Sequence, residues 1–347
     1  MNFSVENIKN TPAFVVDEDL LINNLKVLEK LREETGVKIL LALKAFAMHS
    51  LASRLMQYLD GVCASGLNES SLGAEYFKKE VHVYSPGFKS SEVSKLTQTS
   101  DHVIFNSLTQ FRKLHPEFLA EAKKLGKKLE FGLRVNPGYS EVEVALYNPC
   151  VTGSRFGVLV EELSSLSADE WTKLSGLHFH TMCEQGADVL QRTVAKIEEK
   201  ASQYLSKCKF INLGGGHHIT KPGYDLALLG SIVTHLKERY QCQIYLEPGE
   251  AIALNTGYLV ASVVDIVYNG MNIAVLDTSA TAHMPDVIEM PYRPKVYDAD
   301  LPDILPHTYR LSGSTCLAGD VIGDYSFKHP LEVGDKLVFD DMGTTLW

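Results

Sequence analysis

Short apolar runs alternate with longer amphipathic stretches along the first 250 residues, and this alternation constrains the fold more than any other feature. Each run has the length of a β-strand, is rich in β-branched or aromatic residues, and is bounded by turn residues. Eight such runs occur, at residues 38–45, 61–65, 81–85, 102–107, 129–136, 176–180, 210–214 and 243–248. Because strands separated by helices pair in parallel, and eight of them can close on themselves, the pattern predicts a (β/α)8 TIM-like barrel.

The stretches between these runs carry the apolar spacing of helices. Leu21, Leu25, Leu28 and Leu31 recur at intervals of three and four residues, and Gly36 follows as a stop signal. Residues 189–205 show the same spacing. An open doubly wound sheet is the alternative architecture. Its dinucleotide-binding form is disfavoured, because no G-x-G-x-x-G motif follows the first strand.

The pattern changes after residue 250. Residues 257–267, 273–277, 308–311, 320–322 and 336–340 are strand-like, and the turns between them carry Gly, Pro, Asn and Asp. The run at 13–17 precedes the first helix and has no crossover partner, so we expect it to pair with these later strands. The predicted fold class is therefore α/β, with a barrel at residues 19–250 and a second, all-β C-terminal domain. That domain comprises residues 1–18 and 251–347.

Charge, hydropathy and cysteine usage exclude several classes of protein. The net charge of −10 argues against nucleic acid or an anionic membrane as a partner. No apolar stretch approaches the ~18 residues of a membrane span, and residues 1–11 lack a signal-peptide pattern. The six cysteines form no C-x-x-C pair, which is typical of reduced thiols in a cytoplasmic protein. They are Cys63, Cys150, Cys183, Cys208, Cys242 and Cys316.

Barrels of this kind carry their chemistry where the strands end at the carboxyl face. Lys44 lies in the apolar run LALKAF, where lost hydration would lower the pKa of its amine and make it a nucleophile. A lysine that snorkels from a strand end is the alternative. Glu247, in LEPGE, is placed to hold a proton on a pyridine nitrogen, or else is a solvated acid in a turn.

Glycines and histidines end two other strands. Gly214, Gly215 and Gly216 present consecutive N–H groups to an anion such as phosphate, or form a tight strand-to-helix turn. His178 and His180 lie two residues apart and share one face of a strand. A zinc pair, a ring-stacking histidine and a core histidine all stay open for this face. Because no third ligand has a suitable spacing, we predict no metal site.

Cys316 lies in SGSTCLAGD, between Gly313 and Gly319. A thiol in a loop of glycine and serine is a candidate acid/base group, whereas a thiol buried in an apolar strand is not. A small residue that merely fills the loop is the alternative.

Five motifs, in this order along the chain, resemble those of the fold-type III pyridoxal-phosphate decarboxylases, the alanine racemase/ornithine decarboxylase superfamily. They are LALKAF, GLHFH, LGGGHH, LEPGEA and GSTCLAGD, and the similarity extends from TPAFVVD at 11–17 to KLVFDDM at 336–342. It is nearest to the branch that acts on carboxynorspermidine or carboxyspermidine. The resemblance implies the cofactor pyridoxal 5'-phosphate, a small-molecule polyamine substrate and a homodimer with shared active sites.

The resemblance also implies residue roles. Lys44 would bind the cofactor covalently, His180 would stack on its ring, and Glu247 would keep its pyridine nitrogen protonated. The glycines at 214–216 would bind the phosphate. Cys316 of the partner subunit would protonate the carbon after CO2 leaves.

Three positions depart from, or extend, this pattern. Glu250 stands where ornithine and diaminopimelate decarboxylases usually carry arginine, and an acid there suits a substrate with distal ammonium groups. Asp286, in HMPDVIEM, is a second expected substrate carboxylate. The sequence ends in GTTLW at 343–347, where family members generally continue with a tyrosine-containing segment. A shortened β domain with reduced activity is therefore one expectation.

The predicted activity is decarboxylation of carboxynorspermidine or carboxyspermidine to norspermidine or spermidine. Two alternatives stay open. One is a pyridoxal-phosphate decarboxylase of another basic amino acid, of the ornithine or diaminopimelate type. The other is a non-catalytic homologue that binds the cofactor or a partner.

Overall fold

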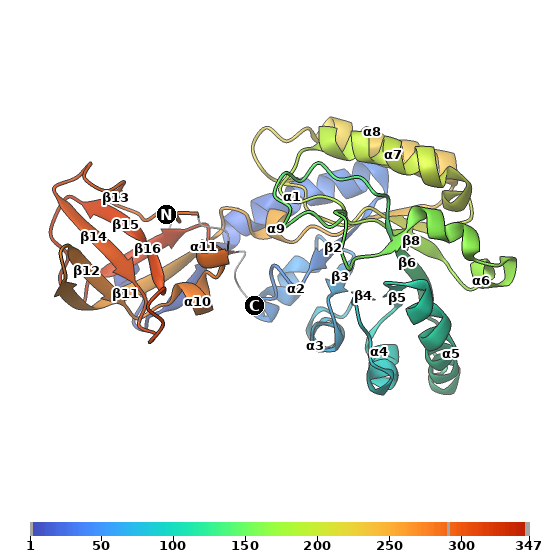
Figure 1. Ribbon diagram of the computed structural model, residues 1–347, viewed down its shortest axis with the longest axis horizontal. Helices are drawn as coiled ribbons and strands as arrows, with labels where there is room; N and C mark the ends of the chain where they lie inside the picture. The colour runs from blue at the N-terminus through green and yellow to red at the C-terminus, as the bar shows by residue number, and fades with distance from the viewer. Residues whose placement is uncertain (1–2, 290–291, 344–347) are drawn as a thin grey trace. The chain divides into compact units, whose positions relative to one another are not determined.

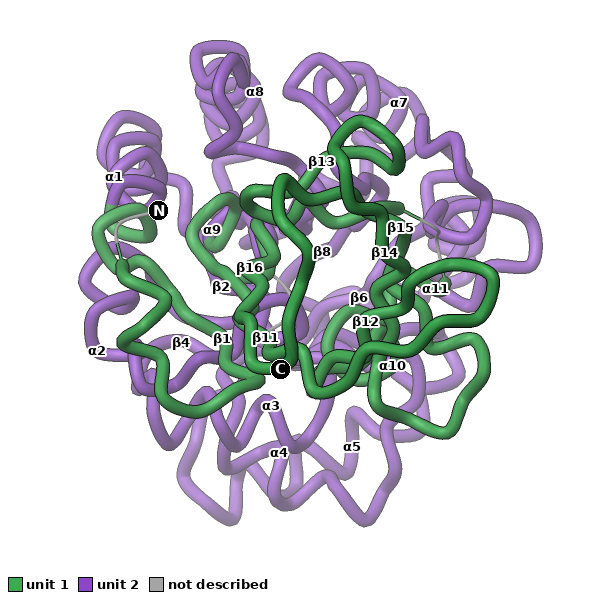
Figure 2. The backbone as a smooth tube through the Cα atoms, turned by 90° about the vertical axis from the view of Figure 1, so that its left-hand side faces the viewer, with its two compact units in different colours: residues 1–22, 253–346 green, residues 23–252, 347 purple. Residues whose placement is uncertain are grey.

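The computed structural model describes residues 3–289 and 292–343, and the chain divides into two compact units (Figure 2). Among the described residues, one unit comprises 23–252 and the other comprises 3–22, 253–289 and 292–343. The boundaries between the two units, after residues 22 and 252, lie close to the domain borders expected at residues 19 and 250. The exact domain borders stay a prediction.

All eight predicted runs form parallel strands, and they close into a barrel (Figure 1). The strands follow the order β5-β4-β3-β2-β10-β9-β8-β6, and pairing of β5 with β6 completes the circle. Their bounds are β2 Lys38–Ala42, β3 Gly61–Ala64, β4 Glu80–Tyr84, β5 His102–Phe105, β6 Glu130–Asn136, β8 Gly176–His178, β9 Phe210–Asn212 and β10 Gln243–Leu246. A two-residue strand, β7 (Val158–Leu159), pairs with the end of β6. The barrel prediction is confirmed, and the open-sheet alternative is wrong.

Helices lie around the outside of the barrel (Figures 1 and 2). The predicted leucine stripe forms α1 (Glu18–Thr35), with all four leucines buried, and Gly36 follows it in the left-handed region at φ +69°. The second predicted helix forms α7 (Ala187–Leu205). The other helices are α2 Ala52–Leu55, α3 Leu67–Leu72, α4 Val93–Thr99, α5 Leu108–Leu125, α6 Ala168–Thr172, α8 Leu226–Tyr240 and α9 Glu250–Ala253. No described helix combines the length and the apolar character needed to cross a membrane.

Inside the barrel, the half nearer the amino ends of the strands combines aromatic rings with a buried ionic group. Glu80 accepts hydrogen bonds from Lys38 Nζ and Tyr245 Oη, each at 2.7 Å, and it lies close to the Nε2 atoms of His82 and His102. The two imidazole rings stack, with their centroids 3.8 Å apart. These contacts fill the half of the barrel nearer the amino ends with aromatic rings and an ion pair between Lys38 and Glu80.

The other unit is a curled mixed sheet with the strand order β1-β11-β12-β14-β15-β13, and β16 pairs with β11. The bounds are β1 Ala13–Val16, β11 Gly257–Tyr268, β12 Asn272–Leu276, β13 Ala299–Asp300, β14 His307–Ser312, β15 Val321–Phe327 and β16 Lys336–Asp340. The N-terminal strand β1 pairs antiparallel with β11, as predicted. Two short helices, α10 (Ala280–His283) and α11 (Asp286–Glu289), interrupt the all-β pattern. Four residues are too few to show a helical period in the sequence.

The predicted shortening of this unit concerns residues 343–347. Gly343 is described, and residues 344–347 lie outside the described residues.

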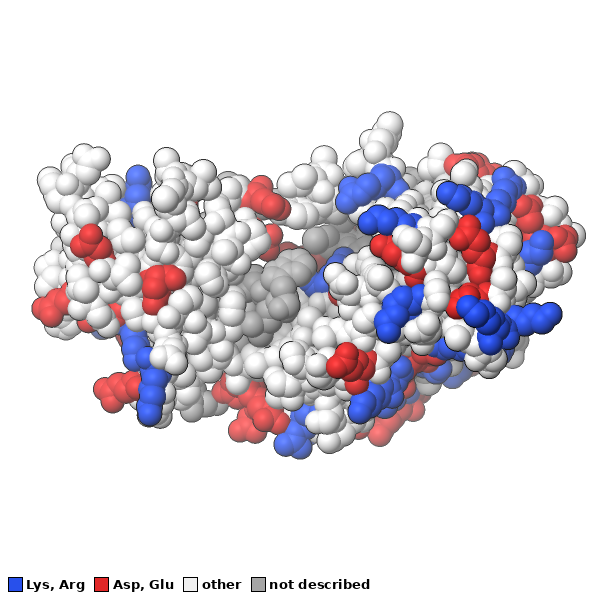
Figure 3. Space-filling view, turned by 90° about the horizontal axis from the view of Figure 1, so that it is seen from below, with Lys and Arg blue, Asp and Glu red and all other residues white. Residues whose placement is uncertain are grey.

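On the face of the molecule shown in Figure 3, acidic and basic side chains are interspersed over the barrel helices. That face therefore carries no patch of a single sign on the barrel.

Candidate active site

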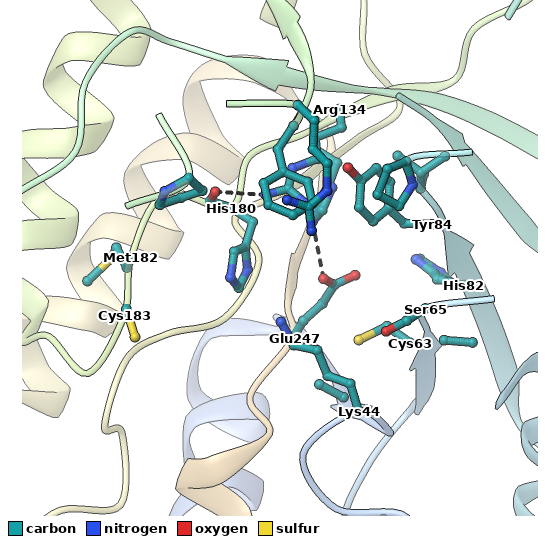
Figure 4. Close-up of a pocket in the computed structure, with 18 of the residues that line it drawn as sticks. Lys44, Cys63, Ser65, His82, Tyr84, Arg134, His180, Met182, Cys183 and Glu247 are labelled. Carbon is teal, nitrogen blue, oxygen red and sulfur yellow. Dashed lines mark hydrogen bonds and ion pairs between the residues drawn. The ribbon is translucent and has the colours of Figure 1, made fainter. Parts of the chain in front are cut away.

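The carboxyl ends of the barrel strands surround a cavity of about 470 Å³ (Figure 4). Its lining side chains come from the ends of β2, β3, β4, β5, β6, β8 and β10. Two further segments, residues 146–149 with 155–156 and residues 182–183, complete the wall. The cavity thus occupies the face at which chemistry is expected in such barrels.

Glu247 follows β10 directly and is the acidic group of the cavity. Its Oε1 accepts a hydrogen bond from Asn212 Nδ2 at 2.7 Å, and its Oε2 lies 3.1 Å from His178 Nε2. Burial by itself would raise the pKa of Glu247, but these contacts, led by His178, lower it to about 2. The carboxylate is therefore ionised at neutral pH and held through both oxygens.

His180 presents a neutral imidazole to the same cavity. Its Nδ1 accepts a hydrogen bond from the backbone N–H of Gly215 at 3.0 Å, which leaves the ring proton on Nε2. Burial lowers the pKa of His180 well below its ordinary value, and the charges of Lys44 and Arg134 lower it further. The tautomer and orientation of the ring are thus set before any ligand binds. Its stacking role stays a prediction.

The glycine turn packs tightly against its neighbours. Gly214 and Gly216 have φ of +69° and +86°, and a Cβ added to Gly215 would lie 2.2 Å from the carbonyl oxygen of Glu247. The N–H of Gly214 donates to Asn212 Oδ1 at 2.8 Å, and that of Gly215 donates to His180. Two of the three amides therefore already donate within the protein, and the phosphate role of the turn stays a prediction.

Lys44 lines the cavity, but its side chain is exposed. The strand β2 ends at Ala42, and Lys44 belongs to the turn that follows, in which the N–H of Phe46 bonds back to the Ala42 carbonyl. Leu43 and Phe46 take the buried positions of this turn. The expectation that the apolar run dehydrates the Lys44 amine is therefore wrong, whereas its place at the cavity agrees with the prediction.

Glu250 begins α9 and lies beside a histidine. Its Oε1 lies 3.2 Å from His218 Nε2, and this carboxylate raises the pKa of His218. The Glu184 carboxylate is close enough that the three potential metal-ligand atoms lie within 4.8 Å of one another. The Glu250 carboxylate therefore has His218 and a second acidic residue, Glu184, as near neighbours. The substrate role of Glu250 stays a prediction.

Cys316 and Asp286 belong to the other unit. Cys316 is an exposed thiol in the loop between β14 and β15. The buried Asp320 holds this loop, since its Oδ2 accepts from the Thr315 hydroxyl at 2.6 Å and its Oδ1 accepts from the Ala280 N–H at 2.8 Å. Asp286 is the first residue of α11. The parts that Cys316 and Asp286 play in the reaction stay predictions.

The fold and this site define a pyridoxal-phosphate decarboxylase, and the chain belongs to the family described as "Pyridoxal-dependent decarboxylase, C-terminal sheet domain", whose model matches residues 13–343. The chain is 42% identical to a carboxynorspermidine/carboxyspermidine decarboxylase of Campylobacter jejuni, over 95% of this chain and 87% of that protein. It is 41% identical to a carboxyaminopropylagmatine decarboxylase of Synechocystis, over 96% of this chain and 84% of that protein. The crystal structure of a Campylobacter jejuni carboxynorspermidine decarboxylase complexed with norspermidine superposes with a TM-score of 0.85 at 40% identity, covering 96% of this chain and 88% of that one.

The residues around the cavity fit the cofactor of this family. An ionised carboxylate matches a protonated pyridine nitrogen, and an amine, Lys44, stands in the same cavity. The Nδ1 atom of His178 is buried without a hydrogen-bond partner, so this atom of the cavity wall is available for a hydrogen bond to a bound molecule. This donor set is suited to an aromatic, charged molecule.

Sequence reasoning missed several residues of the site. His178 was weighed as a zinc-ligating, ring-stacking or core residue, Arg134 was considered structural, and Asn212 and Tyr84 were not considered. The alternation of inward-facing residues along β4, β6, β8 and β9 was the signal that could have found them. Cys63, on β3, also lines the cavity, and burial raises the pKa of its thiol well above the ordinary value.

Proposed function

We propose that this protein removes the carboxylate from the amino-acid end of carboxynorspermidine or carboxyspermidine and releases norspermidine or spermidine. The observation that carries this proposal is the ionised, doubly held Glu247 in one cavity with the Lys44 amine, on a chain with 42% identity to a decarboxylase of those substrates. The Campylobacter relative of known structure binds norspermidine, a product of this reaction.

Bound pyridoxal phosphate supplies a protonated aromatic ring that accepts the electron pair left behind when CO2 departs. In our proposal, Lys44 holds the cofactor through its amine, and Glu247 keeps the proton at the ring nitrogen. The neutral imidazole of His180 would stack on the ring, and the glycine turn would bind the phosphate. Cys316 donates the proton to the carbon that loses its carboxylate.

We further propose a cytoplasmic homodimer in which Cys316 of the partner subunit completes each site. Support comes from the exposure of this thiol on an ordered loop and from the six cysteines, none of which forms a disulfide. Glu250 and Asp286 are proposed to contact the distal ammonium groups of the substrate.

A second candidate substrate is carboxyaminopropylagmatine, and the specific observation in its favour is the 41% identity to the Synechocystis enzyme. Both substrates combine a carboxylated amino-acid end with a cationic distal end, so the same catalytic groups serve either. Ornithine and diaminopimelate are further substrates to compare.

Release of CO2 from a panel of these five substrates tests the proposal. We expect the highest kcat/KM for carboxynorspermidine or carboxyspermidine, and a higher value for carboxyaminopropylagmatine would replace the first candidate by the second. Borohydride reduction of the cofactor-loaded protein, followed by peptide mapping, should label Lys44. A label elsewhere would refute the role of Lys44, and a label at Lys44 without CO2 release would favour a non-catalytic binding protein.

A further inference from the structure

Arg134 is a buried cation in the wall of the active-site cavity (Figure 4). It extends from β6, and only 6% of the residue is exposed. No carboxylate pairs with it among the residues that the structure describes. This is unusual, because an arginine buried to this degree normally has an acidic partner.

Aromatic rings and a carbonyl hold the guanidinium in place. Its Cζ lies over the ring of Tyr84 and over that of Phe156, 4.6 Å from each centroid, so two cation–π contacts hold the group. Its Nη2 donates to the carbonyl oxygen of His180 at 3.2 Å. The Tyr84 hydroxyl in turn donates to Asn106 Oδ1 at 2.7 Å, which fixes the tyrosine ring.

These contacts position the charge, and the Glu247 carboxylate of the same cavity attracts it without forming an ion pair. Arginine carries five N–H donors in a planar fork, and the His180 carbonyl, the Tyr84 hydroxyl and aromatic faces satisfy only part of this capacity. Burial lowers the pKa of Arg134, which expresses the cost of keeping this charge away from water. A fixed, incompletely paired cation that lines a cavity is suited to bind an anion there.

We propose that Arg134 is an anion-binding residue of this site and that its ligand is a singly charged oxygen on the molecule bound in the cavity. This inference deepens the function proposed above and rests on it. Two sources offer that chemistry: the ring oxygen of the cofactor and the carboxylate of the substrate. The guanidinium is held ready for either of them, because its orientation does not depend on the ligand.

The variants Arg134→Gln and Arg134→Lys test this assignment, with Arg112→Gln as the matched control. Arg112 is half exposed on α5 and pairs with Glu170 outside the cavity. Three quantities are compared with the wild-type protein: the Kd of pyridoxal phosphate with its absorption spectrum, the KM of the carboxylated substrate, and the inhibition constant of norspermidine, which lacks a carboxylate.

If the cofactor oxygen is the ligand, Arg134→Gln should raise the Kd of pyridoxal phosphate by about 10- to 100-fold and shift its absorption maximum. If the substrate carboxylate is the ligand, the KM should rise by a similar factor while the cofactor Kd and the norspermidine constant stay unchanged. In either case Arg134→Lys should show a smaller effect, because it keeps the charge but loses the planar fork.

Values of all three quantities within twofold of wild type for Arg134→Gln would overturn the proposal. If Arg134→Gln fails to fold, as judged by circular dichroism, Arg134→Lys decides the question alone. Wild-type values for Arg134→Lys in every measurement would then count against anion binding through the fork. Because the cofactor measurements need no substrate, a failure of the proposed substrate leaves that arm of the test readable.

Discussion

Replacing His178 by phenylalanine removes the main favourable partner of the Glu247 carboxylate and keeps the bulk of a ring. The Glu247 side chain is only 12% exposed, so water screens this interaction weakly. Lowering a pKa from 4.5 to about 2 corresponds to about 3 kcal/mol, at ~1.36 kcal/mol per pH unit. We therefore expect His178→Phe to lose about 2–4 kcal/mol of unfolding free energy at pH 7.

The pH dependence of this loss follows from the direction of the shift. Because the folded-state pKa of Glu247 lies below its ordinary value, its stabilising contribution is complete above pH 4.5 and is lost as the pH falls towards 2. The stability difference between wild type and His178→Phe should therefore shrink across that window. Urea unfolding of the cofactor-free proteins at pH 7, 5, 4 and 3 measures it.

Two further variants make the result specific. His178→Gln keeps an N–H donor for Glu247 and should lose clearly less stability than His178→Phe. His115→Phe is the matched control, since His115 is also buried, packs against Phe111 and Phe131, and has no acidic partner among the described residues. A loss in His178→Phe no larger than in His115→Phe, or a difference that stays constant from pH 5 to pH 3, would refute the reasoning.

Three other predictions concern the glycine turn, the barrel interior and the proposed proton donor. Gly215→Ala places a Cβ 2.2 Å from a backbone oxygen and should cost about 1–3 kcal/mol or more, whereas Gly87→Ala, with open space around it, should leave Tm nearly unchanged. Tyr245→Phe removes the hydroxyl that donates to Glu80 at 2.7 Å and should cost about 1–3 kcal/mol in urea unfolding, so an unchanged midpoint would contradict the hydrogen bond. Cys316→Ala should slow CO2 release or misdirect protonation while cofactor affinity stays the same, and unimpaired turnover to the correct amine would exclude this thiol as the donor.

The fold could be predicted from the sequence because its elements leave repeated local patterns. The apolar runs at 38–45 and 243–248 and the leucine stripe that forms α1 each reflect the periodicity of a single element, and each formed as predicted. The N-terminal strand was inferred by elimination, and its pairing with β11 confirmed it. Helices of four residues, such as α10, escaped notice because they complete barely one turn.

The site was predictable only in part. Glu247 and His180 were found because each follows an apolar run, and strand ends meet at one face of a barrel. Lys44 was placed at the cavity, and of the two interpretations left open for it the exposed, snorkelling lysine is the one the structure favours, because the strand ends two residues before it. Beyond the strand end, Leu43 and Phe46 are buried and Lys44 is not, because burial there depends on which side chains of the turn face the packed interior.

The sequence by itself determined the order of strands and helices, the closure of eight strands into a barrel, and the residue types available at their ends. Only the tertiary structure decided which of those residues act on one another. His178 and Asn212 lie far from Glu247 along the chain, yet together they hold both of its oxygens. The ionisation of Glu247, the tautomer of His180 and the lack of a described carboxylate partner for Arg134 all depend on such long-range neighbours. The reason is that electrostatic interactions depend on distance in space and on burial.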